Sequence, residues 1–149
     1  MSAHGVILLV EDDANDVFLM QRACRKAELP NPLQVVGDGD EAVDYLAGQG
    51  AYSDRARYPL PVLLLLDLKL PRKGGLEVLG WLRQQPNLKR LPVVVLTSSK
   101  EPADVNKAYD LGANSYLVKP LGFDALMEMV RSLNQYWLSL NERAEVREG

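Results

Sequence analysis

The chain has 149 residues, of which 47% are hydrophobic and 25% are charged, so its composition is that of one ordinary globular domain. Its formal net charge of -3 argues against general nucleic-acid binding, and its single histidine, His4, leaves little basis for a zinc site or a Ser/His/Asp triad. The first apolar run, residues 6–10, is too short for a signal peptide or a membrane span, so we expect a cytoplasmic chain without a membrane partner.

Five short apolar runs are predicted to be β-strands. They are residues 6–10, 33–36, 62–66, 93–96 and the weaker run 116–118. Three of them are almost wholly apolar rather than alternating. This pattern is typical of central strands in a parallel sheet that is covered on both faces.

Five helical patterns alternate with these strands. They cover residues 16–27, 40–47, 75–85, 103–111 and 121–140. Asn15 is a plausible N-cap of the first helix, and Gly112 follows the fourth helix at a position where glycine is common. The one cysteine, Cys24, lies on the apolar side of the first helix and is interpreted as a small core residue.

The alternation of strand and helix predicts an α/β fold with a parallel sheet and right-handed crossovers. We expect a single flavodoxin-like, doubly wound domain over residues 1–149, with five helices and the strand order 2-1-3-4-5. Its core should span residues 6–140, and the charged tail 141–149 is expected to be disordered. The connection 48–61 is longer than usual for such folds and is either functional or a plain insertion.

Polar residues follow four of the predicted strands directly. In chain order they are Glu11, Asp12, Asp13, Asp67, Thr97 and Lys119. Ligands of such folds bind beyond the carboxyl ends of the strands, so these side chains should share one crevice. A magnesium ion would relieve the repulsion between crowded carboxylates and join them to phosphate oxygens. The set favours Asp67 as a nucleophile that becomes an acyl phosphate, with Thr97 and Lys119 binding the transferred oxygens.

Four segments resemble the motifs of response regulator receiver domains. They are residues 8–13 (LLVEDD), 65–71 (LLDLKLP, with Gly75 closing the loop), 95–98 (VLTS) and 116–120 (YLVKP). Each segment lies at the end of a predicted strand, and the resemblance covers residues 6–140, which is nearly the whole chain. It implies a two-component signalling protein that assists its own phosphotransfer, not an enzyme.

The resemblance implies a phosphorylation site and a magnesium site. Asp67 resembles the phosphoacceptor and is also a metal ligand. Asp12 resembles the direct metal ligand, Glu11 its neighbour acting through water, and Lys69 the residue whose main-chain carbonyl is the third ligand. A register in which Asp12 and Asp13 form the acidic pair is the alternative. The cofactor is expected to be Mg2+.

The resemblance also implies a conformational switch. Thr97 resembles the switch hydroxyl, Tyr116 the aromatic that turns inward on activation, and Lys119 the lysine that pairs with the phosphoryl group. The bond before Pro120 is expected to be cis. Asp16 is expected only to favour the start of the first helix through its dipole.

The implied partners are a sensor histidine kinase, which donates from a phosphohistidine, and a downstream protein. The long connection and the extended last helix are similar to stand-alone phytochrome regulators, so a phytochrome-type kinase is expected. Met127, Met129, Tyr136 and Trp137 are interpreted as core or as an apolar surface for a homodimer or partner. Two alternatives stay open: a magnesium-dependent phosphohydrolase, which would need an aspartate where Lys69 stands, and a flavodoxin-like flavin or nucleotide binder.

Overall fold

The computed structural model describes residues 4–146 of the chain. The strands are β1 (Ile7–Val10), β2 (Leu33–Val36), β3 (Leu63–Leu66), β4 (Val93–Thr97) and β5 (Ser115–Val118). The α-helices are α1 (Ala14–Lys26), α2 (Gly39–Ala47), α3 (Gly75–Arg83), α4 (Pro102–Asp110) and α5 (Phe123–Gln135). Each predicted strand and helix is therefore present, in the predicted order.

The five strands form one parallel sheet in the order β2-β1-β3-β4-β5, which confirms the predicted topology. Val10 pairs with Val36 of β2 and with Leu66 of β3, so three neighbouring strands end level with one another. On the other side, Thr97 at the end of β4 pairs with Val118 of β5. The residues that follow these strands are thus delivered to the same edge of the sheet.

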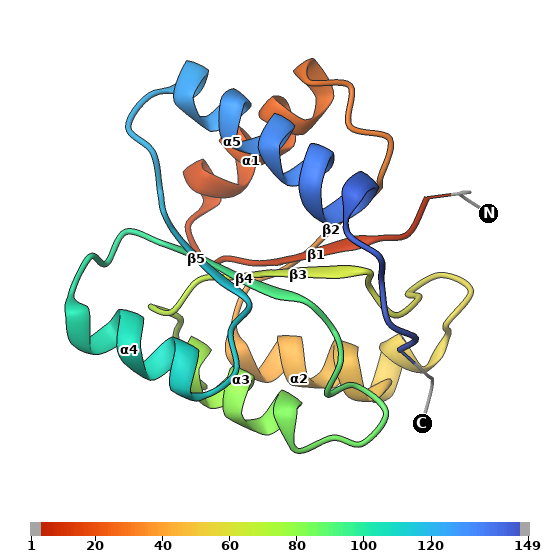
Figure 1. Ribbon diagram of the computed structural model, residues 1–149. Helices are drawn as coiled ribbons and strands as arrows, with labels where there is room; N and C mark the ends of the chain where they lie inside the picture. The colour runs from red at the N-terminus through yellow and green to blue at the C-terminus, as the bar shows by residue number, and fades with distance from the viewer. Residues whose placement is uncertain (1–3, 147–149) are drawn as a thin grey trace.

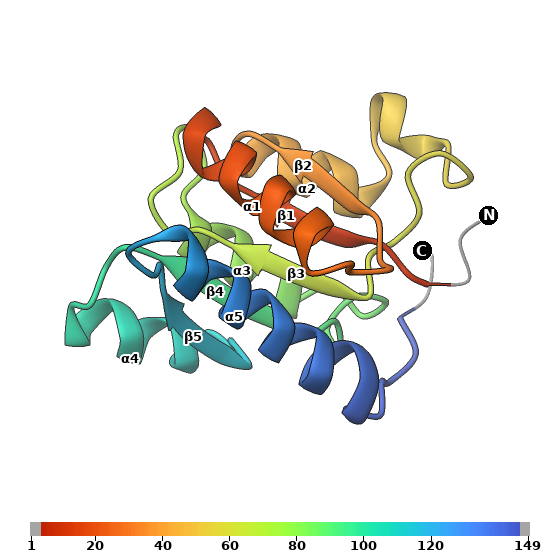
Figure 2. The ribbon, with the colours of Figure 1, turned by 90° about the horizontal axis from the view of Figure 1, so that it is seen from above.

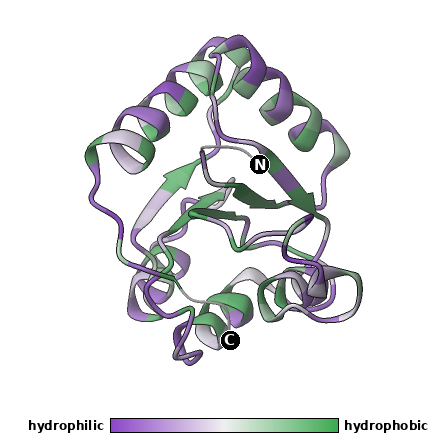
Figure 3. Cartoon of the chain, turned by 90° about the vertical axis from the view of Figure 1, so that its right-hand side faces the viewer, coloured by the Kyte–Doolittle hydropathy of each residue, from purple (hydrophilic) through white to green (hydrophobic). Residues whose placement is uncertain are grey.

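The sheet separates two hydrophobic cores because alternate residues of a strand point to opposite faces. Leu8 and Val10 belong to the core shared with α2, α3 and α4, whereas Ile7 and Leu9 belong to the core shared with α1 and α5. Figures 1 and 2 show these two helical layers on the two faces of the sheet. In Figure 3 the strands at the centre are mostly hydrophobic, whereas the helices around them carry hydrophilic as well as hydrophobic segments. Coverage on both faces explains why β1, β3 and β4 are almost wholly apolar.

Two helix ends differ from the prediction. Asp13, not Asn15, is the N-cap of α1, because its side chain accepts a hydrogen bond from the backbone N–H of Asp16 at 3.0 Å. Aspartate and asparagine cap helices about equally well, so the sequence alone did not separate them. The last helix also ends early, since α5 gives way to a π-helical turn, η2 (Tyr136–Leu140).

The long connection after α2 is folded onto that helix. It contains a short 3₁₀ helix, η1 (Gly50–Ser53), and packs the rings of Tyr52 and Tyr58 near Tyr45, at centroid distances of 5.0 and 6.0 Å. Arg55 donates hydrogen bonds to main-chain carbonyls at the end of α2. The connection therefore caps α2 at the edge of the sheet opposite the acidic turn, which fits a structural insertion.

Residues 141–146 of the charged tail, which is expected to be disordered, lie against the body of the domain in the structure. This segment leaves the end of the last helix and returns past the sheet (Figure 1), where Val146 packs against the core shared with α2, α3 and α4. Two apolar side chains, Ala144 and Val146, line a pocket with Leu60 and Pro92 and account for the docking. Residues 147–149 of the predicted tail lie outside the described part.

No helix within residues 4–146 combines the length and the hydropathy that a membrane span requires.

Candidate functional site

The backbone carries Glu11, Asp67, Thr97 and Lys119 to the edge of the sheet where the carboxyl ends of the strands lie. Asp67 directly follows β3 and donates its backbone N–H to the carbonyl of Val10 at 3.1 Å, continuing the ladder between β1 and β3. Lys119 directly follows β5 and donates its backbone N–H to the carbonyl of Thr97 at 2.8 Å. Because both residues still follow the strand register, their side chains are held by the sheet and not by mobile loops.

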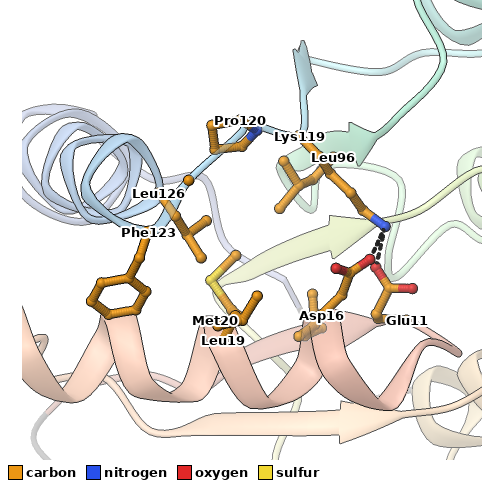
Figure 4. Close-up of a pocket in the computed structure, with 11 residues that line it drawn as sticks. Glu11, Asp16, Leu19, Met20, Leu96, Lys119, Pro120, Phe123 and Leu126 are labelled. Carbon is orange, nitrogen blue, oxygen red and sulfur yellow. Dashed lines mark hydrogen bonds and ion pairs between the residues drawn. The ribbon is translucent and has the colours of Figure 1, made fainter.

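Lys119 is the centre of the charge cluster. Its Nζ lies 2.6 Å from Glu11 Oε1, 2.8 Å from Asp16 Oδ2 and 3.0 Å from Asp67 Oδ2. Figure 4 shows its side chain descending from the end of β5 toward Glu11 and Asp16, beside a cavity between α1 and α5. A lysine ammonium has three N–H donors, so these contacts use its full capacity.

Both oxygens of the Asp67 carboxylate accept hydrogen bonds. Its Oδ1 accepts hydrogen bonds from the buried hydroxyl of Thr97 at 2.8 Å and from the backbone N–H of Lys69 at 3.2 Å. Its Oδ2 accepts from Lys119. The side chain is only 6% exposed, so these donors replace the water that an ionised carboxylate needs.

Burial and charge act on these groups in different directions. Burial is the main reason that the pKa of Glu11 rises to about 7, and the negative charge of Asp67 adds to this effect. Burial would also raise the pKa of Asp67, but hydrogen bonds from Thr97, Lys119 and Lys69 outweigh it and hold the pKa below its ordinary value. Burial would lower the pKa of Lys119, yet its carboxylate partners hold the pKa well above its ordinary value.

Three carboxylates of the site are close enough to share one cation. Oxygen atoms of Glu11, Asp12 and Asp67 lie within 4.8 Å of one another, and Asp12 is exposed while the other two are buried. Asp13 instead caps α1. An all-oxygen set with one side open to water suits a hard divalent cation such as Mg2+, which keeps several waters when bound. The donor set therefore fits the magnesium ion expected from the sequence.

Gly75 closes the loop that follows Asp67, as expected from the sequence. Its backbone N–H donates to the carbonyl of Leu68 at 3.1 Å. A Cβ at this position would lie 2.7 Å from the Cα of Leu68 and would collide with the carbonyl oxygen of Asp67. Any larger residue would therefore displace the backbone that presents Asp67.

A second polar network lies beside the site, on the side of α4. The Ser99 hydroxyl donates to Asp104 Oδ2 at 2.5 Å, and Lys69 Nζ lies 3.6 Å from the same oxygen. The Tyr116 hydroxyl donates to the main-chain carbonyl of Ser99 at 2.9 Å. Lys69, whose side chain is 67% exposed, thus pairs with Asp104 and makes no ion pair with Asp67.

The peptide bond before Pro120 is trans, so the cis bond expected from the sequence is wrong. A bond preceding proline has only a weak preference between the two forms, about 0.5–1 kcal/mol. This weak preference favours the trans form, so a cis bond would need support from its surroundings.

The predicted partner residues of the last helix do not share one environment. Met129, Tyr136 and Trp137 line a groove beside β5 together with Ser115 and Leu117. Tyr136 is 52% exposed there. Met127 is half-buried against the core shared with α1 and α5, and it is absent from the groove.

Two residues in these networks were missed from the sequence. Asp16 was interpreted only as an acid favouring α1, yet it contacts Lys119. Asp104 was not singled out. A signal for Asp16 existed, because side chains in the first turn of a helix tilt back toward its N-terminus, here toward the acidic turn.

Comparisons with known proteins show which family the chain resembles. The sequence matches the response regulator receiver domain over residues 7–131. It is 43% identical over 133 residues to response regulator Rcp1 of Synechocystis sp., covering 89% of this chain and 88% of that protein. The phosphorylated cyanobacterial phytochrome response regulator RcpA has a similar structure, with a TM-score of 0.88 and 39% identity over 96% of this chain and 100% of that one.

A second solved structure that resembles this one contains a metal. The Mn(2+)-bound form of Rcp1 has a TM-score of 0.84 and 41% identity, over 94% of this chain and 99% of that one. The parallel sheet and its strand order agree with the fold of these structures. The chain belongs to the response regulator receiver domain family.

Proposed function

We propose that this chain receives a phosphoryl group on Asp67 from a sensor histidine kinase, in a reaction that requires Mg2+. The observation that carries the proposal is the environment of Asp67. Thr97 and Lys119 donate hydrogen bonds to the two oxygens of Asp67 at 2.8 and 3.0 Å. The carboxylates of Glu11, Asp12 and Asp67 form a three-carboxylate cluster. These are the groups that transfer to a carboxylate needs: a nucleophile, a hydroxyl, an ammonium and a cation site.

In this reaction a carboxylate oxygen of Asp67 attacks the phosphorus of the donor phosphohistidine. The new P–O bond forms as the P–N bond breaks, and the electron pair of the P–N bond returns to the imidazole nitrogen. Glu11, Asp12, Asp67 and the carbonyl of Lys69 would hold the cation, which when bound offsets the negative charge of the carboxylates and the phosphoryl oxygens. Lys119 and Thr97 bind phosphoryl oxygens, because both already direct donors at Asp67.

The signal then passes through Thr97 and Tyr116. A phosphoryl group on Asp67 draws the Thr97 hydroxyl toward it and leaves space beside β4, into which Tyr116 turns. In the structure the Tyr116 hydroxyl is bonded to the carbonyl of Ser99 and its ring packs against the core shared with α4. The inward rotation of Tyr116 would break its hydrogen bond to Ser99. It would also change the surface, formed by α4 and β5, that a downstream protein contacts.

The donor is proposed to be a phytochrome-type histidine kinase in the cytoplasm. Support comes from the similarity to RcpA, a cyanobacterial phytochrome response regulator, which extends over 96% of this chain. The chain is proposed to catalyse only its own phosphorylation and dephosphorylation. Phosphotransfer from a purified phytochrome kinase, compared with an unrelated histidine kinase at equal concentration, tests the pairing, and equal rates from both kinases would contradict it.

The two alternatives considered from the sequence are not favoured, because the chain belongs to the receiver family. Lys69 stands two residues after Asp67, where a phosphohydrolase of the aspartyl-phosphate class would need an acid, and its ammonium pairs with Asp104. An acidic cluster follows β1, where a flavin or nucleotide binder would need a loop that cradles phosphate.

The central experiment is phosphorylation by acetyl phosphate, with and without Mg2+, followed by mass spectrometry. We expect one added phosphoryl group only with Mg2+, located on Asp67 by peptide mapping and absent from Asp67→Asn. Asp13→Asn is the matched control, because asparagine still caps α1 and position 13 lies outside the three-carboxylate cluster. Labelling of Asp67→Asn, or labelling that is independent of Mg2+, would contradict the proposal.

A second copy of this chain is proposed to dock in the groove beside β5. Met129, Tyr136 and Trp137 line this groove, and the outer edge of β5 has no strand partner among the described residues. An open strand edge with an apolar surface beside it favours self-association. Sedimentation velocity should detect a dimer that Tyr136→Glu dissociates. The control is Tyr109→Glu, at a tyrosine on α4 with similar exposure, and a monomeric wild type would contradict the proposal.

A further inference from the structure

Asp16 is the one partner of Lys119 that the proposed chemistry leaves unassigned. Lys119 Nζ contacts Glu11, Asp16 and Asp67 at 2.6, 2.8 and 3.0 Å. Glu11 and Asp67 belong to the three-carboxylate cluster that would hold the cation, and Asp67 would carry the phosphoryl group. Asp16 lies outside that cluster, so a cation and a phosphoryl group would leave its carboxylate available to Lys119.

Apart from Glu11 and Asp67, the surroundings of Lys119 offer its ammonium no comparable substitute for Asp16. On this side the lysine lines a cavity of about 120 Å³ whose other walls are mostly apolar, including Met20 and Phe123. Figure 4 shows Asp16 at one end of this cavity, directly below the tip of Lys119, with the apolar side chains farther along α1 and α5. When the cation and the phosphoryl group engage Glu11 and Asp67, an ammonium that lacks Asp16 would therefore turn outward to water, which a flexible four-carbon stem permits.

We propose that Asp16 is a positioning residue that holds the Lys119 ammonium over Asp67 while the cation and the phosphoryl group occupy the other carboxylates. This inference rests on the proposed function of the site. The contact with Asp16 does not draw Lys119 away, because the Asp16 and Asp67 oxygens both lie within 3.0 Å of Nζ at once. Asp16 thus keeps the ammonium where the phosphoryl oxygens will bind. The entropy cost of ordering the long Lys119 side chain is then not part of the barrier to phosphotransfer.

A helix-stabilising role for Asp16 makes different predictions. Asp16 lies in the first turn of α1, where any acid interacts favourably with the helix dipole. That role would act on the stability of α1 and would be independent of Lys119. A position-matched control is Asp124, an exposed aspartate in the first turn of α5, a helix of the same length of 13 residues.

The first experiment measures the rate of phosphorylation by acetyl phosphate at saturating Mg2+ and donor. We expect Asp16→Ala to lower this rate at least about tenfold, because misplacement of a catalytic group by 1 Å can cost about a hundredfold. Asp16→Asn keeps an oxygen that accepts from Lys119 and should retain most of the rate, and Asp124→Ala should match the wild type. In a Lys119→Ala background, Asp16→Ala should have no further effect, because the two residues act as a unit.

The second experiment needs no phosphorylation and is run at saturating Mg2+, which would engage Glu11 and Asp67 and leave Asp16 as the acceptor for Lys119. Acylation of Lys119 by an amine-reactive ester, followed by peptide mass spectrometry, should be several-fold faster in Asp16→Ala than in the wild type or in Asp124→Ala. Unchanged acylation would overturn the proposal, as would a loss of rate that persists in the Lys119→Ala background. A wild type that acetyl phosphate does not label would count against the proposed function instead, and the acylation result would still decide whether Asp16 holds Lys119.

Discussion

Glu11 shows how one residue can tie protonation to folding. Its side chain is 4% exposed, its Oε1 faces Lys119, and its Oε2 accepts the backbone N–H of Asp13 at 3.1 Å. Burial raises its pKa to about 7, despite these two favourable contacts. The chain therefore keeps a carboxyl that resists ionisation at the position where the proposed cation binds.

The pH dependence of stability in metal-free buffer should show this effect. The folded chain keeps the Glu11 proton up to about pH 7, whereas the unfolded chain loses it near 4.5. The folded state thus binds more protons in this window, and Glu11 makes the free energy of unfolding fall as pH rises through it, by at most about 1.4 kcal/mol per pH unit. Asp67, whose pKa is lowered, contributes the opposite slope only below its ordinary value of 3.8.

Urea denaturation between pH 4.5 and 7 measures this slope. Glu11→Gln should flatten it, because the amide does not titrate, while Asp13→Asn should keep the wild-type slope. If the wild type and Glu11→Gln had parallel stability profiles over this window, the raised pKa of Glu11 would be wrong.

At the scale of elements, α4 is tied to the site through its first turn. Asp104 of α4 accepts the Ser99 hydroxyl, and Tyr116 of β5 donates to the Ser99 carbonyl. The hydrogen bond from Ser99 holds the pKa of Asp104 below its ordinary value. The loop between β4 and α4 is therefore held by the carboxylate on one side and by the phenol on the other.

Removing the Asp104 carboxylate should loosen this junction. In Asp104→Ala we expect amide hydrogen exchange to accelerate several-fold over residues 98–105, because Ser99 loses the acceptor that fixes the loop. Exchange in α2, on the same face of the sheet, should not change. Asp110→Ala, at the exposed end of α4, is the control, and equal exchange profiles for the two variants would exclude a special role for Asp104.

At the scale of the whole molecule, the sheet joins the site to both cores. Glu11 and Asp67 follow strands whose alternate residues belong to opposite cores. A ligand that binds only when these residues are gathered stabilises the complete fold by mass action. Cation binding is therefore measurable as global stability, without any assay of phosphotransfer.

Mg2+ should raise the melting temperature of the wild type and chelation should reverse the rise. At a concentration a hundredfold above the dissociation constant the gain is about 2.7 kcal/mol, or several degrees for a chain of this size. Asp12→Ala should show a much smaller gain, because it removes the exposed carboxylate of the cluster. Asp13→Asn should respond like the wild type, and an equal response in Asp12→Ala would argue against the assigned cation site.

Much of the fold and of the site was predictable, because both depend on local features of the sequence: the pattern of apolar residues and the position of polar residues at the ends of strands. The apolar runs that became β1, β3 and β4 are buried throughout, as expected of strands covered on both faces. Asp67, Thr97 and Lys119 stand at the ends of their strands, and parallel strands deliver their carboxyl ends to one edge. Position along the chain was therefore enough to gather them.

The sequence by itself determined the topology and the chemical identity of the site, since hydrophobic period and position relative to a strand are local properties. Only the tertiary structure decided which side chains of the site contact one another. Asp16 and Lys119 are 103 residues apart in the chain, and their contact depends on how α1 packs beside the end of β5. The docking of Val146 beside Leu60 and Pro92 likewise depends on packing between segments that are distant in the chain.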